Sequence, residues 1–305
     1  MESFQIEGGH RLKGNIIPQG AKNEALQILC AVLLTEDTLT ISNIPDIVDV
    51  NNLIGLLKKM GVKVSYIEKG KYSFKADAVD LKFIDTSEYK TYAKQLRGSV
   101  MLVGPMLSKY GKGSIPRPGG DKIGRRRLDT HFEGLKLLGA NFNYNKEDHF
   151  YTVTANQLQG KHLLLEEASV TGTANIVMAS VLAKGTTTIY NAACEPYLQQ
   201  LCKMLNRMGA KISGLGSNLL TIEGVDTLSG TEHKVLPDMV EIGSWIGLAA
   251  MTQSEITIKS VSWDDLGKIP NVFSKLGIEL ERRSDDIFIP SHKNGYEIQN
   301  YIDGS

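Results

Sequence analysis

Four segments of the chain end a predicted helix with the same signal, a glycine directly after a large apolar residue. The glycines are Gly61, Gly139, Gly209 and Gly277, which are 78, 70 and 68 residues apart. Apolar residues three and four apart precede each one and mark a buried helix face, and a glycine just beyond favours a helix C-cap. A second, more apolar helix is predicted upstream in each unit, over 23–34, 96–107, 173–182 and 242–250.

Short strand-like runs accompany these helices and complete a repeating unit. Runs such as 38–41, 186–190 and 255–258 follow the apolar helices, and further strand candidates follow each capping glycine, with 150–154 the clearest. Each unit therefore predicts the order β-α-β-α-β-β, in which one sheet face is buried under two helices. The fold class expected is α/β, and residues 11–18 predict an additional first strand.

A change in composition at 229–234 predicts a domain boundary. The first domain then covers 22–229 and holds three complete repeats. The second domain combines 1–21 with 230–305 and is incomplete, because only one further unit is present.

Overall composition excludes several classes of protein. Lys and Arg number 34 and so do Asp and Glu, so the formal net charge is zero, and there is no apolar run long enough to span a membrane. The N-terminus lacks the basic start and apolar stretch of a secretory signal, so a cytoplasmic location is expected. Cys30, Cys194 and Cys202 show no CxxC spacing, and the six histidines form no ligand-spaced cluster. We therefore expect neither disulfides nor a metal site, and the sequence does not predict the oligomeric state.

The segment from Lys112 to Arg127 concentrates charge in this neutral chain. It holds six Lys or Arg residues and one acid, Asp121, beside glycines that let the backbone approach a ligand. Arginines around a carboxylate indicate an anionic ligand and a proton to transfer. A solvated loop is the alternative. Nucleic-acid binding is disfavoured by the zero net charge and by the lack of stacking aromatic residues between Gly111 and Arg127.

Several short motifs in a fixed order carry a resemblance to a known family. They are Gly20-Ala21-Lys22-Asn23-Glu24-Ala25, Asn43-Ile44-Pro45 with Asp49, the loop 118–129, Asn191-Ala192-Ala193 with Glu195-Pro196, and Leu236-Pro237-Asp238. Together they resemble the UDP-N-acetylglucosamine 1-carboxyvinyltransferases, which are enolpyruvyl transferases. The resemblance covers essentially the whole chain. It implies an inside-out α/β barrel of six repeats in two domains, with the active site between the domains. Four of the six repeats are present in this chain.

The same resemblance implies the chemistry and the residues that carry it. The family transfers the enolpyruvyl group of phosphoenolpyruvate to the 3-hydroxyl of UDP-N-acetylglucosamine and releases phosphate, early in peptidoglycan synthesis, without a metal or other cofactor. Lys22 and Asp121 match catalytic positions. The matching substrate-binding residues are Lys22, Asn23, Arg97, Arg126, Arg127, Leu128, Asp129, Thr130, Glu167, Ala168, Ser169 and Val170.

Structural roles compete with some of these assignments. Asn23 has the residue type of a helix cap, Arg125 and Arg127 suit a solvated surface, and Asp129 suits a cap for the following helix. Asp238 and Glu241 have the spacing of a capping pair, and Asp49 has a similar status. Arg97 stands at a helix start, where the dipole disfavours a cation, and this misfit indicates function.

Two departures from the family pattern shape the expectations. Most members carry cysteine where Asp121 stands, as the general acid toward C3 of phosphoenolpyruvate. The chain also stops short of the family's last two repeats, so we expect a fragment that binds nucleotide sugar weakly and does not turn over. The rival hypotheses are an enolpyruvylshikimate-phosphate synthase-like enzyme and a non-catalytic RNA-binding repeat protein.

Overall fold

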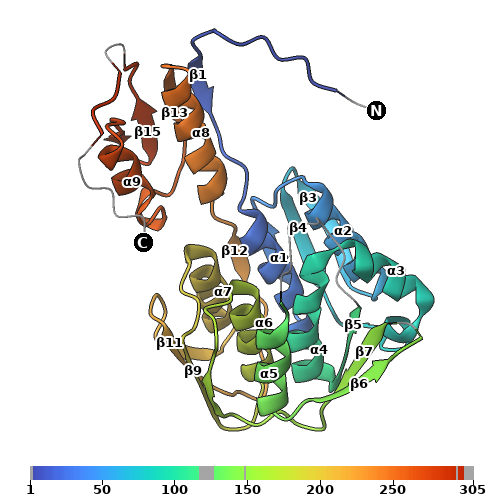
Figure 1. The fold of residues 1–305 in the computed structure, drawn as a ribbon. Helices are drawn as coiled ribbons and strands as arrows, with labels where there is room; N and C mark the ends of the chain where they lie inside the picture. The colour runs from blue at the N-terminus through green and yellow to red at the C-terminus, as the bar shows by residue number, and fades with distance from the viewer. Residues whose placement is uncertain (1–2, 117–126, 148, 293–294, 299–305) are drawn as a thin grey trace. The chain divides into compact units, whose positions relative to one another are not determined.

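The computed structural model describes residues 3–116, 127–147, 149–292 and 295–298. The chain forms two compact units, which are coloured along the sequence in Figure 1. The larger unit is Lys22–Val235, and the smaller unit combines Met1–Ala21 with Leu236–Ser305. The chain therefore crosses from one unit to the other twice.

The strands described in the larger unit form three sheets, ordered β12-β2-β4-β3, β5-β7-β6 and β10-β11-β9-β8. One face of each sheet is buried, as in β9, where Thr187 and Ile189 point inward between exposed or half-buried neighbours. This period of two is the one predicted for a half-buried strand. The strands are β2 (Leu39–Ser42), β3 (Lys63–Glu68), β4 (Lys71–Lys75), β5 (Lys112–Pro116), β6 (Asn141–Asn145), β7 (Phe150–Thr154), β8 (His162–Leu164), β9 (Thr186–Tyr190), β10 (Lys211–Ser213), β11 (Leu219–Glu223) and β12 (Glu232–Lys234).

Helices fill the centre of the larger unit and the sheets lie around them (Figure 1). This arrangement, with helices inside and strands outside, is the one expected from the sequence. The helices are α1 (Lys22–Ala31), η1 (Val32–Leu34), α2 (Val48–Lys59), η2 (Phe83–Asp85), α3 (Ser87–Gln95), η3 (Arg97–Leu102), α4 (Val103–Tyr110), α5 (Asp129–Leu137), α6 (Val170–Ser180) and α7 (Pro196–Arg207), where η marks a 3₁₀ segment.

Three central helical segments run in the same direction. The Asn175 side chain on α6 accepts from Gly104 N at 2.7 Å, and one turn further along Ser108 Oγ donates to Ala179 O at 3.0 Å, so η3–α4 and α6 are parallel. The start of α1 packs against η3, and the following η1 packs against α4, so α1 shares this direction. Their N-termini therefore lie at one end of the larger unit.

The glycines that end the four amphipathic helices adopt the expected conformation. Gly61, Gly139, Gly209 and Gly277 have φ of 97°, 105°, 106° and 79°, in the left-handed region that glycine adopts without a Cβ penalty. They follow α2, α5, α7 and α9 (Ile269–Lys275). The predicted helix C-caps are confirmed at all four positions.

One repeat departs from the predicted order. Where the pattern predicts the first strand of the second unit, the chain forms η2 and α3, and the sheet there has three strands. Thr86 explains the helix, because its hydroxyl accepts from Tyr89 N at 3.1 Å and caps α3.

The smaller unit contains one four-stranded sheet ordered β1-β13-β15-β14 among its described residues. Ile256, Ile258, Ile287 and Ile289 of this sheet are buried against the helical residues Ile242 and Ile246. The elements are β1 (Lys13–Ile16), α8 (Met239–Met251), β13 (Glu255–Ile258), η4 (Trp263–Asp265), α9, β14 (Glu281–Arg283) and β15 (Asp286–Ile289).

The two units exchange their first strands. β1 precedes α1 in the sequence but pairs with β13 of the smaller unit, whereas β12 precedes α8 but pairs with β2 of the larger unit, both in parallel. The larger unit therefore extends to Val235 instead of ending at the composition change near 229. The domain limits drawn from the sequence remain a proposal.

Candidate active site

Several predicted site residues lie at the N-termini of the parallel central helices. Lys22 begins α1, Arg97 begins η3, and Ser169 caps α6 through an Oγ that accepts from Gly172 N at 3.2 Å. The first N–H groups of a helix lack partners within the helix, and the aligned peptide dipoles place partial positive charge there. This end of the larger unit is thus suited to bind an anion.

Lys22 is accessible at this end and forms an ion pair with Asp49, in the first turn of α2. Asn23 is exposed and is the second residue of α1, so it does not precede the helix as a cap. The alternative capping role of Asn23 is therefore wrong, and the side chain faces solvent beside Lys22.

The two stretches expected to bind the nucleotide sugar meet in the structure. Thr130 Oγ1 donates to Glu167 Oε1 at 3.3 Å, which connects the start of α5 to the segment before α6. Thr130 also approaches Gly172 so closely that a Cβ there would lie 2.7 Å from its Cγ2. Leu128 and Val170 are half-buried next to exposed Arg127, Glu167 and Ala168, so this junction is open to a ligand.

Asp129 is the first residue of α5, and Leu128 occupies the capping position without a side-chain cap. The alternative of Asp129 as the cap is therefore wrong. Its Oδ2 lies 3.8 Å from Arg127 Nε, and both side chains are exposed. Asp121, Arg125 and Arg126 lie outside the described residues.

A buried polar network that sequence reasoning missed lies beneath these residues. His131 Nδ1 lies 3.0 Å from the amide nitrogen of Asn175, and Nε2 lies 3.2 Å from Thr171 Oγ1. Since the amide nitrogen can only donate, Nδ1 accepts and the imidazole proton lies on Nε2. The network joins α5 to α6 under the open junction. Polar residues inside otherwise apolar helices were the only sequence signal for it.

His131 predicts an acid-sensitive stability. Burial, and then the nearby charge of Arg97, lower the pKa of His131 to about 4. Between about pH 6.5 and pH 4, His131 is protonated in the unfolded chain but stays neutral in the folded chain. Protonation therefore favours the unfolded chain, so the stability is highest above pH 6.5 and decreases as the pH falls toward 4. We expect the free energy of unfolding to fall by about 3 kcal/mol over this window.

Chemical denaturation at pH 7 and pH 4.5 measures this effect, and His131→Asn is the control because it cannot titrate. The variant is expected to lose less stability between the two pH values than the unsubstituted chain. An equal loss in both proteins would contradict the assignment to His131.

Asp238 in the smaller unit has the structural role that its spacing indicated. Its Oδ1 accepts from Val240 N at 2.8 Å and from Glu241 N at 3.4 Å, so it caps α8. The Glu241 carboxylate accepts from Gln19 N at 2.8 Å. The capping role of Asp238 is confirmed, but Glu241 does not complete the pair, because the Asp238 N–H donates to Gln19 O at 2.8 Å.

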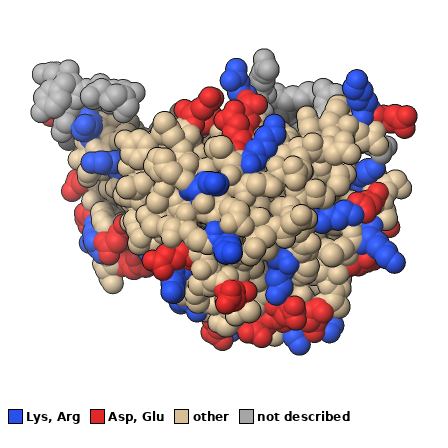
Figure 2. Space-filling model, turned by 90° about the horizontal axis from the view of Figure 1, so that it is seen from below, with Lys and Arg blue, Asp and Glu red and all other residues tan. Residues whose placement is uncertain are grey.

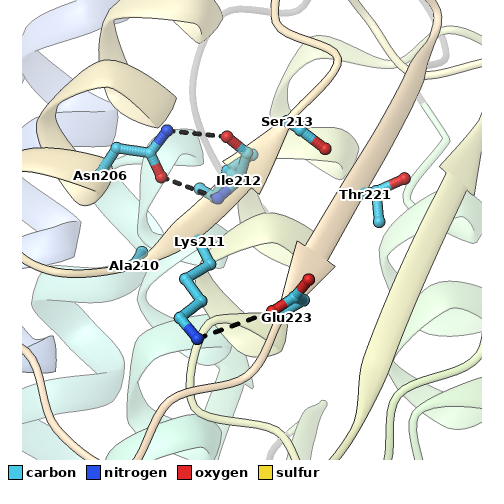
Figure 3. A pocket seen from close by; sticks show the side chains of 7 residues that line it. All are labelled: Asn206, Ala210, Lys211, Ile212, Ser213, Thr221 and Glu223. Carbon is cyan, nitrogen blue, oxygen red and sulfur yellow. Dashed lines mark hydrogen bonds and ion pairs between the residues drawn. The ribbon is translucent and has the colours of Figure 1, made fainter.

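A surface depression of about 250 Å³ lies elsewhere, on β10 and β11 (Figure 3). Several of its polar groups are hydrogen-bonded or paired with one another. The Asn206 side chain bonds both the N and O of Ile212 at 2.8 Å, and Lys211 pairs with Glu223 at 3.7 Å. None of the predicted site residues lines it. We therefore do not regard it as the candidate site.

Metal and thiol chemistry receive no support from the part of the chain that the structure describes. No group of three or more His, Cys, Asp or Glu residues there is placed to hold a metal ion. Cys30 and Cys202 are buried, and burial raises the pKa of Cys202 to about 12, so its thiol is held protonated. Among the described helices, none is both long and apolar enough to cross a bilayer.

Comparisons with known proteins identify the family of this chain. The family model of EPSP synthase (3-phosphoshikimate 1-carboxyvinyltransferase) matches residues 6–301. The UDP-N-acetylglucosamine 1-carboxyvinyltransferase of Bacteroides thetaiotaomicron is 64% identical over 305 residues, which are 100% of this chain and 70% of that relative.

Solved structures show the same fold at low sequence identity. The enolpyruvyl transferase NikO from Streptomyces tendae has a TM-score of 0.78 at 17% identity, over 93% of this chain and 67% of that one. An EPSP synthase from Acinetobacter baumannii has a TM-score of 0.71 at 18% identity, over 93% and 66% of the two chains. The expected α/β fold class, with helices inside and sheets outside, is confirmed.

Proposed function

Since this chain belongs to the EPSP synthase family of enolpyruvyl transferases, we infer that it transfers the enolpyruvyl group of phosphoenolpyruvate to the 3-hydroxyl of UDP-N-acetylglucosamine, the committing step of peptidoglycan synthesis. The observation that carries this inference is the 64% identity, over every residue of the chain, to a UDP-N-acetylglucosamine 1-carboxyvinyltransferase. The sequence identity to the solved EPSP synthase of Acinetobacter baumannii is only 18%, so that likeness supports the fold alone.

The phosphoenolpyruvate phosphate is assigned to the start of α1. The Lys22 ammonium and the positive end of the α1 helix dipole supply positive charge, and exposed Asn23 supplies a further hydrogen bond. Asp49 pairs with Lys22, so a bound phosphate would compete with this carboxylate for the ammonium.

The nucleotide sugar is assigned to the junction of α5 and α6. Arg97, Arg126 and the stretches 127–130 and 167–170 would contact it, with Arg126 outside the described residues. The Thr130 to Glu167 hydrogen bond supports this assignment, because it fixes the two stretches against each other while their neighbours stay exposed, and the cap from Ser169 fixes the start of α6.

The reaction needs a proton at C3 and a cation for the departing phosphate. The sugar hydroxyl gives its proton to a base and its oxygen adds to C2 of phosphoenolpyruvate, while C3 gains a proton, for which we assign Asp121 as the acid. The C2–O bond to phosphate then breaks, C3 loses a proton, and the enol double bond is restored on the sugar. Lys22 stabilises the leaving phosphate. We place the reaction in the cytoplasm, and the three free cysteines support this, because thiols persist in reducing compartments.

The RNA-binding alternative lacks support on the face shown in Figure 2. Blue and red residues there are scattered around a broad tan centre, and those drawn in colour form no continuous basic surface. An electrostatic footprint for nucleic acid needs such a surface.

Calorimetric titration tests the proposed substrate. We expect UDP-N-acetylglucosamine to bind the chain with one site and a Kd up to about 1 mM, in the usual range for enzyme substrates. Arg97→Gln should weaken this binding, and Lys63→Ala, an exposed lysine on β3, should not. Heat from shikimate 3-phosphate but none from the nucleotide sugar would overturn the proposal, as would steeply salt-dependent RNA binding alone.

A further inference from the structure

A carboxylate, an imidazole and a guanidinium form a hydrogen-bonded chain inside the larger unit. Glu24 is the third residue of α1 and its side chain is 0% exposed, and its Oε1 lies 2.8 Å from Nε2 of His233 on β12. His233 Nδ1 lies 2.6 Å from Nη2 of Arg207, the last residue of α7. Three elements that are distant in sequence meet at this point.

The partners fix the direction of these hydrogen bonds. A guanidinium is always protonated and can only donate, so His233 Nδ1 accepts from Arg207. The imidazole is then neutral with its proton on Nε2, which donates to the Glu24 carboxylate. The order of donation is Arg207 to His233 to Glu24, and the two formal charges at the ends balance.

Burial makes this chain of contacts an anchor for α1. An ionised carboxylate without water is costly unless it is paired and hydrogen-bonded, so displacing Glu24 from His233 is strongly unfavourable. The contact ties the first turn of α1 to β12, which is in turn paired with β2. The position of that turn is therefore set by side-chain contacts as well as by the packing of the helix.

The anchored turn is the one that carries the phosphate assignment. Glu24 is two residues from Lys22, and the same turn bears Asn23 at the positive end of the helix dipole. Lys22 pairs with Asp49, whose side chain is 37% exposed. The backbone that places the Lys22 ammonium is the same helical turn that Glu24 connects to β12.

We propose that Glu24, His233 and Arg207 are positioning residues that hold the start of α1, and with it Lys22, in the geometry that binds the phosphate of phosphoenolpyruvate. This rests on the proposed function, which places phosphate at Lys22. Misplacement of a binding group by about 1 Å is costly, so loss of the anchor weakens phosphate binding without any loss of charge at Lys22. The nucleotide-sugar junction lies on other helices, α5 and α6, and is connected by its own hydrogen bond from Thr130 to Glu167.

The test compares Glu24→Ala with Glu24→Gln in the full chain. Alanine removes the acceptor for His233, whereas glutamine keeps an oxygen in its place and should restore the anchor. Thr35→Val is the matched control, because Thr35 is buried in the same unit and its hydroxyl donates to Leu228 O at 2.6 Å, away from the start of α1. Calorimetry measures the Kd of inorganic phosphate, phosphoenolpyruvate and UDP-N-acetylglucosamine for each protein.

We expect Glu24→Ala to raise the Kd of phosphate and phosphoenolpyruvate by about tenfold and that of the nucleotide sugar by less than about twofold. Glu24→Gln and Thr35→Val should stay close to the unsubstituted chain for every ligand. Unchanged phosphate binding in Glu24→Ala, an equal loss for both ligand classes, or no recovery with glutamine would each overturn the proposal. Should the alanine variant not fold, His233→Asn, which lacks the Nε2 atom that contacts Glu24, carries the same expectation.

Hydrogen exchange separates this proposal from the proposed function. If Lys22→Ala leaves phosphate binding unchanged, the phosphate assignment fails. The anchor is then judged by the amides of 26–28, which form the first hydrogen bonds within α1. Faster exchange in Glu24→Ala but not in Glu24→Gln or Thr35→Val supports it, and equal exchange in all four proteins overturns it.

Discussion

Replacing Lys22 by alanine is expected to weaken the binding of phosphoenolpyruvate and of inorganic phosphate by about 100-fold. Hydrogen bonds that involve a charged group contribute about 1.5–3 kcal/mol each, and the upper part of that range corresponds to two orders of magnitude in Kd. The substitution also leaves Asp49 at the start of α2 without this cation, so its carboxylate then repels an incoming phosphate. Calorimetric titration with both ligands measures the change.

Two variants make the result specific to the start of α1. Lys63→Ala removes an equally positive side chain from an exposed ion pair with Asp77 in the same unit, and should leave phosphate binding unchanged. Asp49→Asn frees the Lys22 ammonium and should preserve or strengthen the binding. A similar loss in the Lys22 and Lys63 variants would show that only overall charge matters, and would remove phosphate from this helix start.

Fosfomycin is expected to leave the unsubstituted chain without a covalent adduct. The resemblance implies that this inhibitor alkylates a loop thiol, and this chain has Asp121 at that position. A thiolate is the stronger nucleophile, whereas a carboxylate at this position is assigned to proton transfer. Intact-mass spectrometry after incubation with fosfomycin and UDP-N-acetylglucosamine reads the outcome as the presence or absence of one added inhibitor.

Asp121→Cys is the matched gain-of-function control. It restores the thiol and should acquire a single adduct, while Cys194, the exposed cysteine already present, should stay unmodified in both proteins. An adduct mapped to Asp121 in the unsubstituted chain would show that this carboxylate acts as a nucleophile, and would refute its assignment as a proton donor alone.

The periodic parts of the fold could be read from the sequence because they depend on local rules. The strand at 150–154 appears at those residues as β7, and Gly61 and its three counterparts end their helices as predicted. The strand exchange could not be read in this way, because the pairing of β1 with β13 and of β12 with β2 joins segments more than 190 residues apart. α3 was missed because its cap, Thr86, carries a local signal that the repeat pattern outweighed.

The site divides in the same way between local and distant information. Lys22 and Arg97 were placed at helix starts from sequence, and they are found there, whereas the helix expected from residue 173 begins earlier and is capped by Ser169. The buried polar groups beneath these residues could not be predicted, because no sequence pattern near Asn175 or His233 indicates which residue each one contacts. In the sequence, Glu24 is only one member of a motif, and its contact with His233 is known from the fold alone. Sequence patterns thus supplied the residues proposed to bind the ligand, and the structure showed which buried polar groups lie next to them.

The double crossing between the units determines how the chain would respond to mechanical force. At the crossings, Ala21 N donates to Leu236 O at 2.7 Å and Asp238 N donates to Gln19 O at 2.8 Å, so the two connecting segments are fastened side by side. Tension applied to the two chain ends would pass across these two hydrogen bonds and through the β1–β13 pair. Both connections to the larger unit lie behind these two hydrogen bonds. The larger unit would therefore carry no tension until the bonds broke. Stretching a single molecule should therefore extend the smaller unit first and release the larger one in a separate, later step.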